Sequence, residues 1–437
     1  MTRKLLIAAV ILITALLGDG PAIGSDTGFT PEQQALNIDS FDMVWTTIRD
    51  QHYDPELLGL DWEAIGERYR PRVEEAATVD DVRIALTEMI GELGQSHFNI
   101  LPGEIFRDID GTGEVQFMAG TVGLEVRGVE GRSLVVAVAD GSPAALAGIR
   151  TGWEIDSVNG RKVQPMLDRV TEEFQDHTYL ALYQAAVVQR YLDGDVGDRV
   201  TVVVMNAENT PIELQLTMEP KPGWRSQAGN LPPFYLEFDA RLLDGNIGYI
   251  TFSNFMDPLR LMPAFNEALE SFMGADGLVI DIRGNGGGMA PIAMGMAGGL
   301  VPGKEQYLGT LMMRNMKLKT IVYPRPRTYA GPVAVLIDGL SASCSELFSG
   351  GLKDLGRARL FGTTTAGAVL MSTVQELPNG DALQYAFADY VSRGGQTLEG
   401  VGVIPHETVR HTRAALLDGE DLPLLEATAW ILENKTN

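Results

Sequence analysis

Residues 332–355 read PVAVLIDGLSASCSELFSGGLKDL and join three kinds of local structure in one short stretch. The run PVAVLID (Pro332–Asp338), which is apolar almost throughout, predicts a buried strand. The small residues of 339–344 predict a tight loop, and SELFSGGLKDL predicts a helix with Ser343 or Ser345 as its N-cap. A buried strand that leads directly into a helix is typical of α/β folds.

The same alternation runs through residues 234–437, which we assign to one α/β core domain. Further strands are predicted at NIGYITFSNF (246–255), GLVIDIRGN (277–285) and RARLFGT (357–363), and a helix at MPAFNEALESFM (262–273). The preceding KPGWRSQAGNLPP (221–233) is rich in Pro and Gly and predicts a linker.

Two regions before the core have a different character. Residues 25–117 predict a helical segment, because FDMVWTTIRDQHYD (41–54) and VDDVRIALTEMIGEL (79–93) carry apolar residues at spacings of three and four. Residues 118–222 predict a β-rich domain with Gly and Asn turns, which contains a helical insert over Arg169–Leu192. The chain of 437 residues is therefore expected to be an α/β multidomain protein.

Residues 1–24 have the pattern of a signal peptide. Two basic residues, Arg3 and Lys4, precede the apolar run Leu5–Leu17, and small residues follow before Ser25, where we predict cleavage. The alternative is an uncleaved anchor, but a membrane-spanning helix needs about 20 apolar residues. The expected mature protein is exported, periplasmic or secreted, with no integral membrane anchor, and a bacterial envelope is the favoured compartment.

Charge and cysteine content exclude several functional classes. The net charge is −24, with 58 acidic and 34 basic residues, which argues against nucleic acid and anionic membranes as partners. The single cysteine, Cys344, excludes an internal disulfide. The glycine-rich GNGGGM (284–289) lacks the spacing of a dinucleotide-binding loop, and no zinc motif is present, so no cofactor is expected.

The loop of the opening stretch is a candidate nucleophile site. A serine between a strand end and a helix N-terminus lies where backbone N–H groups stabilise developing negative charge. The alternative interpretation is that Ser341, Ser343 and Ser345 only cap the helix. A catalytic serine also needs a base within reach, and no such base is present in SASCSELFSGG (341–351) itself.

SASCSELFSGGLKDLGRARLFGT (341–363) resembles the nucleophile segment of the C-terminal processing and tricorn-core serine peptidases. The resemblance implies that Ser343 is the nucleophile and that Cys344 stands where these families carry alanine. It also implies a ClpP/crotonase-like α/β core. The processing branch uses a lysine base about 25 residues further on, where this chain has Ala368. The nearest lysine is Lys353.

The tricorn-core branch supplies a different base. LGQSHFNI (93–100) is similar to its Leu-Gly-x-Ser-His pattern, and EGVGVIP (399–405) to its glutamate segment. The resemblance implies that His97 is the general base, that Ser96 orients it and that Glu399 lies behind Ser96. It further implies an oxyanion hole formed by the N–H groups of Cys344 and of a glycine in DIRGNGGG (281–288), for which Gly287 is favoured and Gly286 is the alternative.

VGLEVRG (122–128) and SPAALAGIRTGWEIDSVNGRKV (142–163) resemble a PDZ domain. The resemblance implies a peptide-binding edge at Gly123, Leu124, Glu125 and Val126, which would recruit or gate substrate. A purely structural domain is the alternative. The helical insert at 165–192 departs from the family pattern and is placed to cover the groove.

These observations together predict an exported serine endopeptidase that acts on peptides or proteins through an acyl-enzyme on Ser343. Homo-oligomerisation is left open. One alternative is a catalytically inactive ligand- or peptide-binding protein on the same scaffold, because fold does not imply function. A second is a hydrolase of non-peptide esters or amides, and a third is a Ser-Lys mechanism that uses Lys353.

Overall fold

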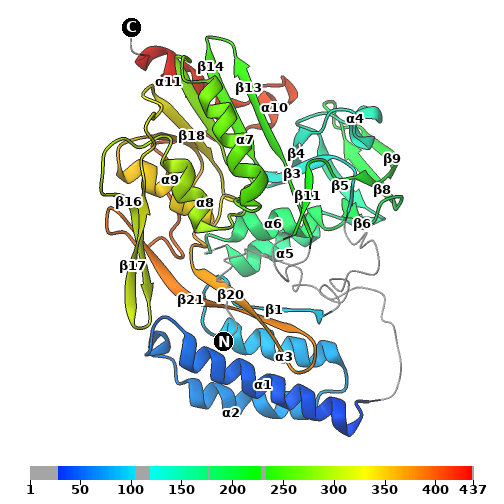
Figure 1. Ribbon diagram of the computed structural model, residues 1–437. Coiled ribbons are helices and arrows are strands. Elements are labelled where there is room, and N and C mark those ends of the chain that lie inside the picture. Colours follow the sequence, from blue (N-terminus) through cyan, green and yellow to red (C-terminus); the bar gives the residue numbers. More distant parts are fainter. Residues whose placement is uncertain (1–27, 104–118, 176, 228–232, 436–437) are drawn as a thin grey trace.

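A computed structural model describes residues 28–103, 119–175, 177–227 and 233–435 (Figure 1). The predicted signal peptide at 1–24 lies outside the described residues. Figure 1 shows a layer of helices at one end of the molecule, a mixed α/β body at the other, and a smaller β-rich domain beside that body. The chain is thus a multidomain protein of mixed α/β structure, as the sequence predicted.

The α/β body is built on a six-stranded sheet in the order β13-β14-β15-β18-β19-β22, in which β13 is antiparallel to β14 and the other pairs are parallel. The strands are β13 (Phe238–Leu243), β14 (Ile247–Phe252), β15 (Gly277–Asp281), β18 (Val333–Ile337), β19 (Arg359–Gly362) and β22 (Glu407–Thr408). Both β15 and β18 are buried over their whole length, as their continuous apolar sequences predicted. Ligands of parallel sheets bind at the carboxyl ends of the strands, which here carry the loops that follow β15 and β18.

Helices cover both faces of this sheet. Those of the body are α7 (Pro258–Ser271), α8 (Ala290–Ala297), α9 (Cys344–Asp354), α10 (Arg413–Leu417) and α11 (Leu422–Asn434). The apolar cluster on one face contains residues of α7, α8 and α9, such as Phe265, Met296 and Phe348. On the other face, Ile431 of α11 packs with Val279 and Leu336. The helices and strands predicted for the core are confirmed.

A second sheet of five strands was not anticipated from the sequence. It consists of β1 (Asn99–Leu101), β16 (Gln306–Met313), β17 (Met316–Val322), β20 (Met371–Glu376) and β21 (Ala382–Ser392). All pairs are antiparallel, and β21 pairs with β1, β16 and β20. Because β1 follows the Ser96–His97 pair directly, its pairing with β21 brings the N-terminal segment to the core.

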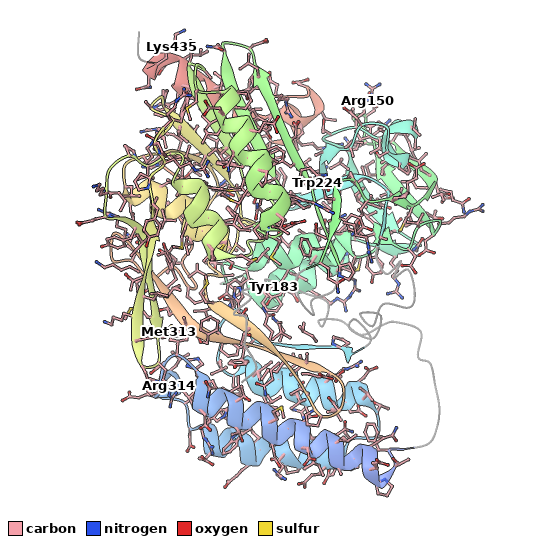
Figure 2. All side chains as sticks on the ribbon, in the orientation of Figure 1. Arg150, Tyr183, Trp224, Met313, Arg314 and Lys435 are labelled. Carbon is pink, nitrogen blue, oxygen red and sulfur yellow. The ribbon has the colours of Figure 1, made fainter. Side chains whose placement is uncertain are left out.

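The N-terminal helices form a layer on this second sheet. They are α1 (Pro31–Gln51), α2 (Trp62–Glu74) and α3 (Val79–Gly91), and the short η1 (Leu57–Gly59) follows α1. One apolar cluster joins Leu86 of α3 to Leu383 of β21. At the turn between β16 and β17, Arg314 donates to the carbonyl of His52 at 3.0 Å, so the hairpin also holds the helical layer (Figure 2).

The middle domain has its own sheet in the order β3-β4-β5-β8-β9, with β6 paired to β5. Its elements are β3 (Leu124–Val129), β4 (Arg132–Val138), α4 (Pro143–Leu146), β5 (Glu154–Val158), β6 (Arg161–Lys162), α5 (Gln164–Phe174), α6 (Leu180–Gln189), β8 (Arg199–Met205) and β9 (Pro211–Thr217). The helical insert is divided into α5 and α6. The polar stretch between them interrupts the apolar pattern and favours a turn over a helix.

Two small sheets lie near the boundary between the middle domain and the core. One joins three segments of the middle domain and consists of β2 (Gly120–Thr121), β7 (Asp193–Gly194) and β10 (Glu219–Pro220). The other pairs β11 (Trp224–Ser226) of the linker with β12 (Phe234–Leu236) of the core. The predicted linker at 221–233 therefore contains a strand. Among the described residues, no helix combines the length and the apolar character that crossing a membrane requires.

Candidate active site

Ser343 has a strained backbone between β18 and α9. Its φ of 55° and ψ of −115° are unusual for a residue with a side chain. Such strain persists only where the surroundings impose it, and it is common at functional sites. The Ser343 N–H donates to the carbonyl of Ala368 at 2.9 Å and to Glu346 Oε2 at 3.0 Å, and these two bonds hold the turn in place.

The fully buried carboxylate of Glu346 links the nucleophile loop to the next segment of the core. It accepts from the N–H of Ser343, from the hydroxyl of Thr365 at 2.6 Å, and from the N–H groups of Gly367 and Ala368 at 2.8 and 2.9 Å. Burial raises its pKa to about 7, and these four donors oppose that shift. Sequence analysis gave Glu346 no role, although the Ser343-x-x-Glu346 spacing of a capping box was available as a signal.

The loop after β15 packs against the nucleophile loop. Asn285 accepts from Ala342 N–H through its carbonyl at 3.1 Å and from Ser345 Oγ through its side-chain oxygen at 3.0 Å. Ser341 Oγ donates to the carbonyl of Ile282 at 2.7 Å. Ser341 of the predicted loop and Ser345 of the first turn of α9 therefore hold the two loops together.

Gly287, the predicted oxyanion donor, lies directly against the nucleophile. A Cβ added to Gly287 would stand 2.7 Å from Ser343 Cβ and 2.9 Å from the nitrogen of Cys344, and its φ is +99°. Its N–H donates to Asn285 Oδ1 at 2.9 Å. A Cβ added to Gly286, the alternative oxyanion donor, would have nothing within 4 Å.

We expect Gly287→Ala to slow the reaction of Ser343 with a fluorophosphonate by about 10²-fold, the effect of losing one oxyanion donor. The added methyl group would push the loop away from Ser343. In addition, the positive φ of Gly287 disfavours any residue with a side chain. The rate of labelling measures this directly. Gly274→Ala is the control, because a Cβ there meets nothing within 4 Å; equal rates for both variants would contradict the assignment.

Cys344 is fully buried and begins α9 directly after Ser343. Burial raises the pKa of its thiol, so the thiol is protonated at neutral pH. A protonated, buried thiol is a poor nucleophile, in agreement with its interpretation as a small space-filling residue.

Ser96, His97 and Glu399 form a continuous hydrogen-bonded chain. Ser96 Oγ lies 2.7 Å from His97 Nδ1 and donates to Glu399 Oε2 at 3.0 Å. Because Ser96 gives its only proton to the carboxylate, it must accept from Nδ1–H, which leaves the lone pair of the imidazole on Nε2. Within the described residues, Nε2 is buried and has no hydrogen-bond partner.

The protonation states of His97 and Glu399 agree with this series of hydrogen bonds. Burial lowers the pKa of His97 to about 4, so the imidazole is neutral at pH 7. Removal from water raises the pKa of Glu399, and donors oppose that shift. Besides the hydroxyl of Ser96, the donors are the N–H groups of Ser96 at 2.7 Å and Val369 at 2.9 Å and the hydroxyl of Tyr179 at 2.7 Å.

The hydrogen bonds of Ser96, His97 and Glu399 and those of Ser343 reach adjacent residues, Ala368 and Val369. The carbonyl of Ala368 accepts from Ser343 N–H, and the next N–H, of Val369, donates to Glu399. The strand that follows, β20, pairs with β21, and β1 pairs with the same half of β21. The sheet therefore brings Ser96 and Glu399 next to the segment that contacts Ser343. Among the described residues His97 Nε2 has no hydrogen-bond partner, so no hydrogen bond joins it to Ser343 Oγ, 246 positions away in the sequence.

The fold and the motifs are shared with known proteins. Residues 246–409 match the family model described as "Peptidase family S41", and residues 39–91 match that of the "Tricorn protease C1 domain". The chain is therefore similar to the S41 peptidases over its core domain. It is therefore a serine-type peptidase, whose substrates are peptides or proteins.

Relatives of this peptidase include named proteases. It is 24% identical to the carboxy-terminal processing protease CtpA of Bacillus subtilis, over 98% of this chain and 81% of the relative. It is 26% identical to putative tricorn protease homolog 2 of Streptomyces coelicolor, over 90% of this chain and 32% of that longer protein. Its fold is similar to that of mature CPAF complexed with lactacystin, with a TM-score of 0.62, 15% identity and coverage of 92% of this chain and 100% of that one.

Lys353 lies away from Ser343, the predicted nucleophile. It is near the last turn of α9, and its Nζ donates to the carbonyl of Ile404 at 2.7 Å. Ten residues of helix separate it from Ser343 by about 15 Å along the axis. The geometry therefore argues against a Ser-Lys mechanism through this lysine.

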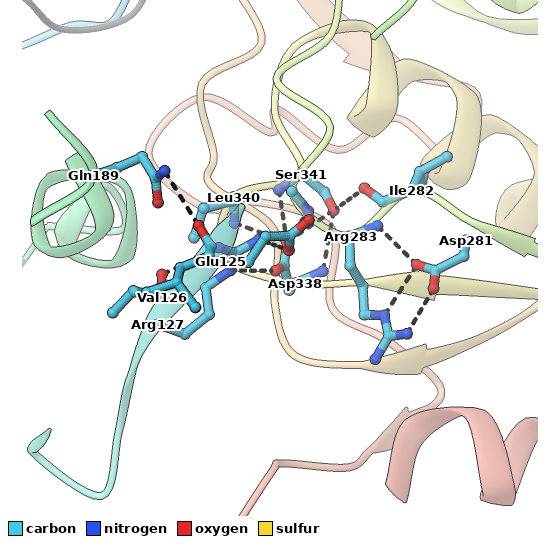
Figure 3. Close-up of polar contacts among 12 residues, drawn as sticks. Glu125, Val126, Arg127, Gln189, Asp281, Ile282, Arg283, Asp338, Leu340 and Ser341 are labelled. Carbon is cyan, nitrogen blue, oxygen red and sulfur yellow. Dashed lines mark hydrogen bonds and ion pairs between the residues drawn. The ribbon is translucent and has the colours of Figure 1, made fainter. Parts of the chain in front are cut away.

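The predicted peptide-binding edge lies on β3, beside α6. Gln189, the last residue of α6, donates from Nε2 to the carbonyl of Leu124 at 3.3 Å (Figure 3). The helical insert therefore contacts the edge of β3 that a bound peptide would use. On the same strand, Arg127 forms an ion pair with Asp338, which also accepts from Gly284 N–H at 2.9 Å. Sequence analysis missed this link between the middle domain and the two active-site loops.

Proposed function

We propose that this peptidase is an exported endopeptidase that hydrolyses peptide bonds through an acyl-enzyme on Ser343, with His97 as general base. One observation carries the proposal: Ser96 bridges His97 Nδ1 and Glu399, which directs the lone pair of the imidazole to the buried Nε2. Export rests on the sequence of the first 24 residues alone.

The proposed reaction has two halves. His97 Nε2 takes the proton of Ser343 Oγ while Oγ bonds to the scissile carbonyl carbon, and the imidazolium then gives that proton to the leaving amine as the C–N bond breaks. In the second half, water loses a proton to the same nitrogen as its oxygen bonds to the acyl carbon, and the imidazolium then returns that proton to Ser343 Oγ as the acyl–Oγ bond breaks. Glu399, through Ser96, stabilises the transient positive charge on the imidazolium.

The negative charge of the tetrahedral intermediate would be stabilised by backbone N–H groups. Cys344 N–H lies at the start of α9, where the helix dipole adds to the effect. Gly287 is the favoured second donor because it adjoins Ser343, and its N–H would exchange Asn285 Oδ1 for the oxyanion. Gly286 is the alternative donor.

We propose that the middle domain is PDZ-like and recruits or gates substrate. β3 is the edge strand of its sheet, and an added peptide strand would bond along Gly123, Leu124, Glu125 and Val126. The contact of Gln189 with Leu124 would have to open first. The relatives named for carboxy-terminal processing make a polypeptide with an accessible C-terminal segment the expected substrate.

The test is covalent labelling with a fluorophosphonate, read by intact mass and peptide mapping. We expect one label on Ser343, none in Ser343→Ala, loss of labelling in His97→Ala and normal labelling in Cys344→Ala. Absence of labelling in the folded wild-type protein would instead support a binding protein on the same scaffold. A Ser-Lys mechanism predicts the reverse pattern, with labelling kept in His97→Ala and lost in Lys353→Met.

A further inference from the structure

The turn between α5 and α6 brings the middle domain to the carboxylate of Glu399. Tyr179 is the residue before α6, and its hydroxyl donates to Glu399 Oε1 at 2.7 Å. The same hydroxyl interacts with the side chain of Ser96. Glu399 therefore receives hydrogen bonds from the N-terminal segment through Ser96, from the core through Val369 and from the middle domain through Tyr179.

Packing fixes the position of this turn on the core. An apolar cluster beside the nucleophile consists of Leu182, Ala342, Ala366 and Ala368, with Tyr179 and Leu340 packed against it. Next to the cluster, a Cβ added to Gly367 would lie 2.7 Å from Thr178 Oγ1, so the turn and the segment after β19 are in close contact. Tyr179 thus reaches Glu399 from a docked surface and is held there by more than its hydrogen bond.

We propose that Tyr179 is a positioning residue for the reaction, whose phenol holds Glu399 charged and directed at Ser96, so that the active site is complete only when the middle domain is docked on the core. This inference rests on the function proposed above, because Tyr179 acts through Glu399 and Ser96 on His97.

The electrostatics of the pair explain why a phenol suits this place. Burial, and then the charge of Glu399, raise the pKa of Tyr179, so it keeps its proton and acts as a donor across the neutral range. Its hydrogen bond lowers the pKa of Glu399, against the rise that burial causes. Other titratable groups that interact with this pair are Tyr53, whose pKa is raised in part by Glu399, and Glu346, whose charge acts on Tyr179. His97 contacts Glu399 only through Ser96.

The experiment compares wild-type protein with Tyr179→Phe, which removes the hydroxyl and keeps the ring. The readout is the rate of fluorophosphonate labelling of Ser343 as a function of pH. The substitution removes the hydrogen bond from Tyr179 to the charged carboxylate of Glu399. We therefore expect the acid limb of the plot of labelling rate against pH to move up by about one pH unit. Labelling should then be about tenfold slower on that limb and within about threefold of wild type on the alkaline plateau.

Two further variants separate positioning from simple packing. Tyr191→Phe removes a hydroxyl from the end of the same insert, where its partners are Arg161 and Arg190, and should leave the profile unchanged. Tyr179→Ala should shift the acid limb as Tyr179→Phe does. Faster labelling in both Tyr179 variants at every pH would show that Tyr179 obstructs Ser343, and would overturn the inference.

The remaining outcomes distinguish the inference from the proposed function. A Tyr179→Phe profile that superimposes on that of wild type, in a protein whose labelling depends on His97, overturns the inference and leaves the proposed function intact. A wild-type protein that is not labelled, or one whose labelling survives His97→Ala, overturns the proposed function and the inference with it.

Discussion

His97→Ala is expected to lower the rate of Ser343 phosphonylation, and of hydrolysis of a labelled casein, by about 10⁴-fold at neutral pH. The buried imidazole is the group that would take the proton of Ser343, because its Nδ1 faces Ser96, its Nε2 has no hydrogen-bond partner among the described residues, and its lowered pKa of about 4 keeps it neutral at this pH. The folded structure should persist, because the ring makes a single polar contact. His406→Ala is the matched control: this exposed histidine accepts only the N–H of Leu360.

The same substitution should also change how stability depends on pH. In the unfolded chain His97 would titrate near 6.5, and in the folded protein its pKa is lowered to about 4. As pH falls from about 6.5 to 4, the unfolded chain gains a proton that the folded protein does not, so the free energy of unfolding falls. This fall should be smaller in His97→Ala by chemical denaturation. Labelling that survives the substitution, or identical pH dependence of stability, would contradict the assignment.

Asp381→Ala is expected to destabilise the protein by about 3 kcal/mol, the cost of leaving one partner of a buried ion pair without the other. Asp381 lies at the turn between β20 and β21 and binds Arg83 of α3, with a shortest distance of 2.7 Å. Its side chain is 3% exposed and that of Arg83 is 19% exposed. The carboxylate also accepts from Gly103 N–H at 2.8 Å, shortly after β1.

Because this pair joins the helical layer to the second sheet, its loss should also slow the labelling of Ser343 by displacing the Ser96–His97 segment. Equilibrium denaturation and labelling rates measure the two effects. Asp80→Ala is the control, since Asp80 also pairs with Arg83, at 3.5 Å, but its side chain is 83% exposed, and exposed pairs contribute little. Equal stability of the two variants would show that the docking of the helical layer does not depend on Asp381.

Local pattern was sufficient for the central elements of the fold. The continuous apolar runs at β15 and β18 predict buried parallel strands, and the small residues after β18 predict the tight loop that holds Ser343. The sequence patterns at 262–273 and 345–355 also predicted α7 and α9, whereas α8, α10 and α11 were not predicted. The second sheet was missed because β16, β17, β20 and β21 are antiparallel strands with partners far apart in the chain. Their short alternating patterns carry no signal of the pairing.

The sequence by itself determined the class of protein, through motifs whose chemistry is local: a serine at the start of a helix, a Ser-His pair, a glycine-rich loop and a glutamate near a glycine. Only the tertiary structure decided which of these groups contact one another. Ser96 and Glu399 are 303 residues apart and share a hydrogen bond because β1 and β20 flank the same strand. Tyr179 reaches that carboxylate by the docking of a third domain. Hydrogen bonds depend on positions in space to within a few tenths of an ångström, and such positions arise from packing between distant segments, which no local pattern encodes.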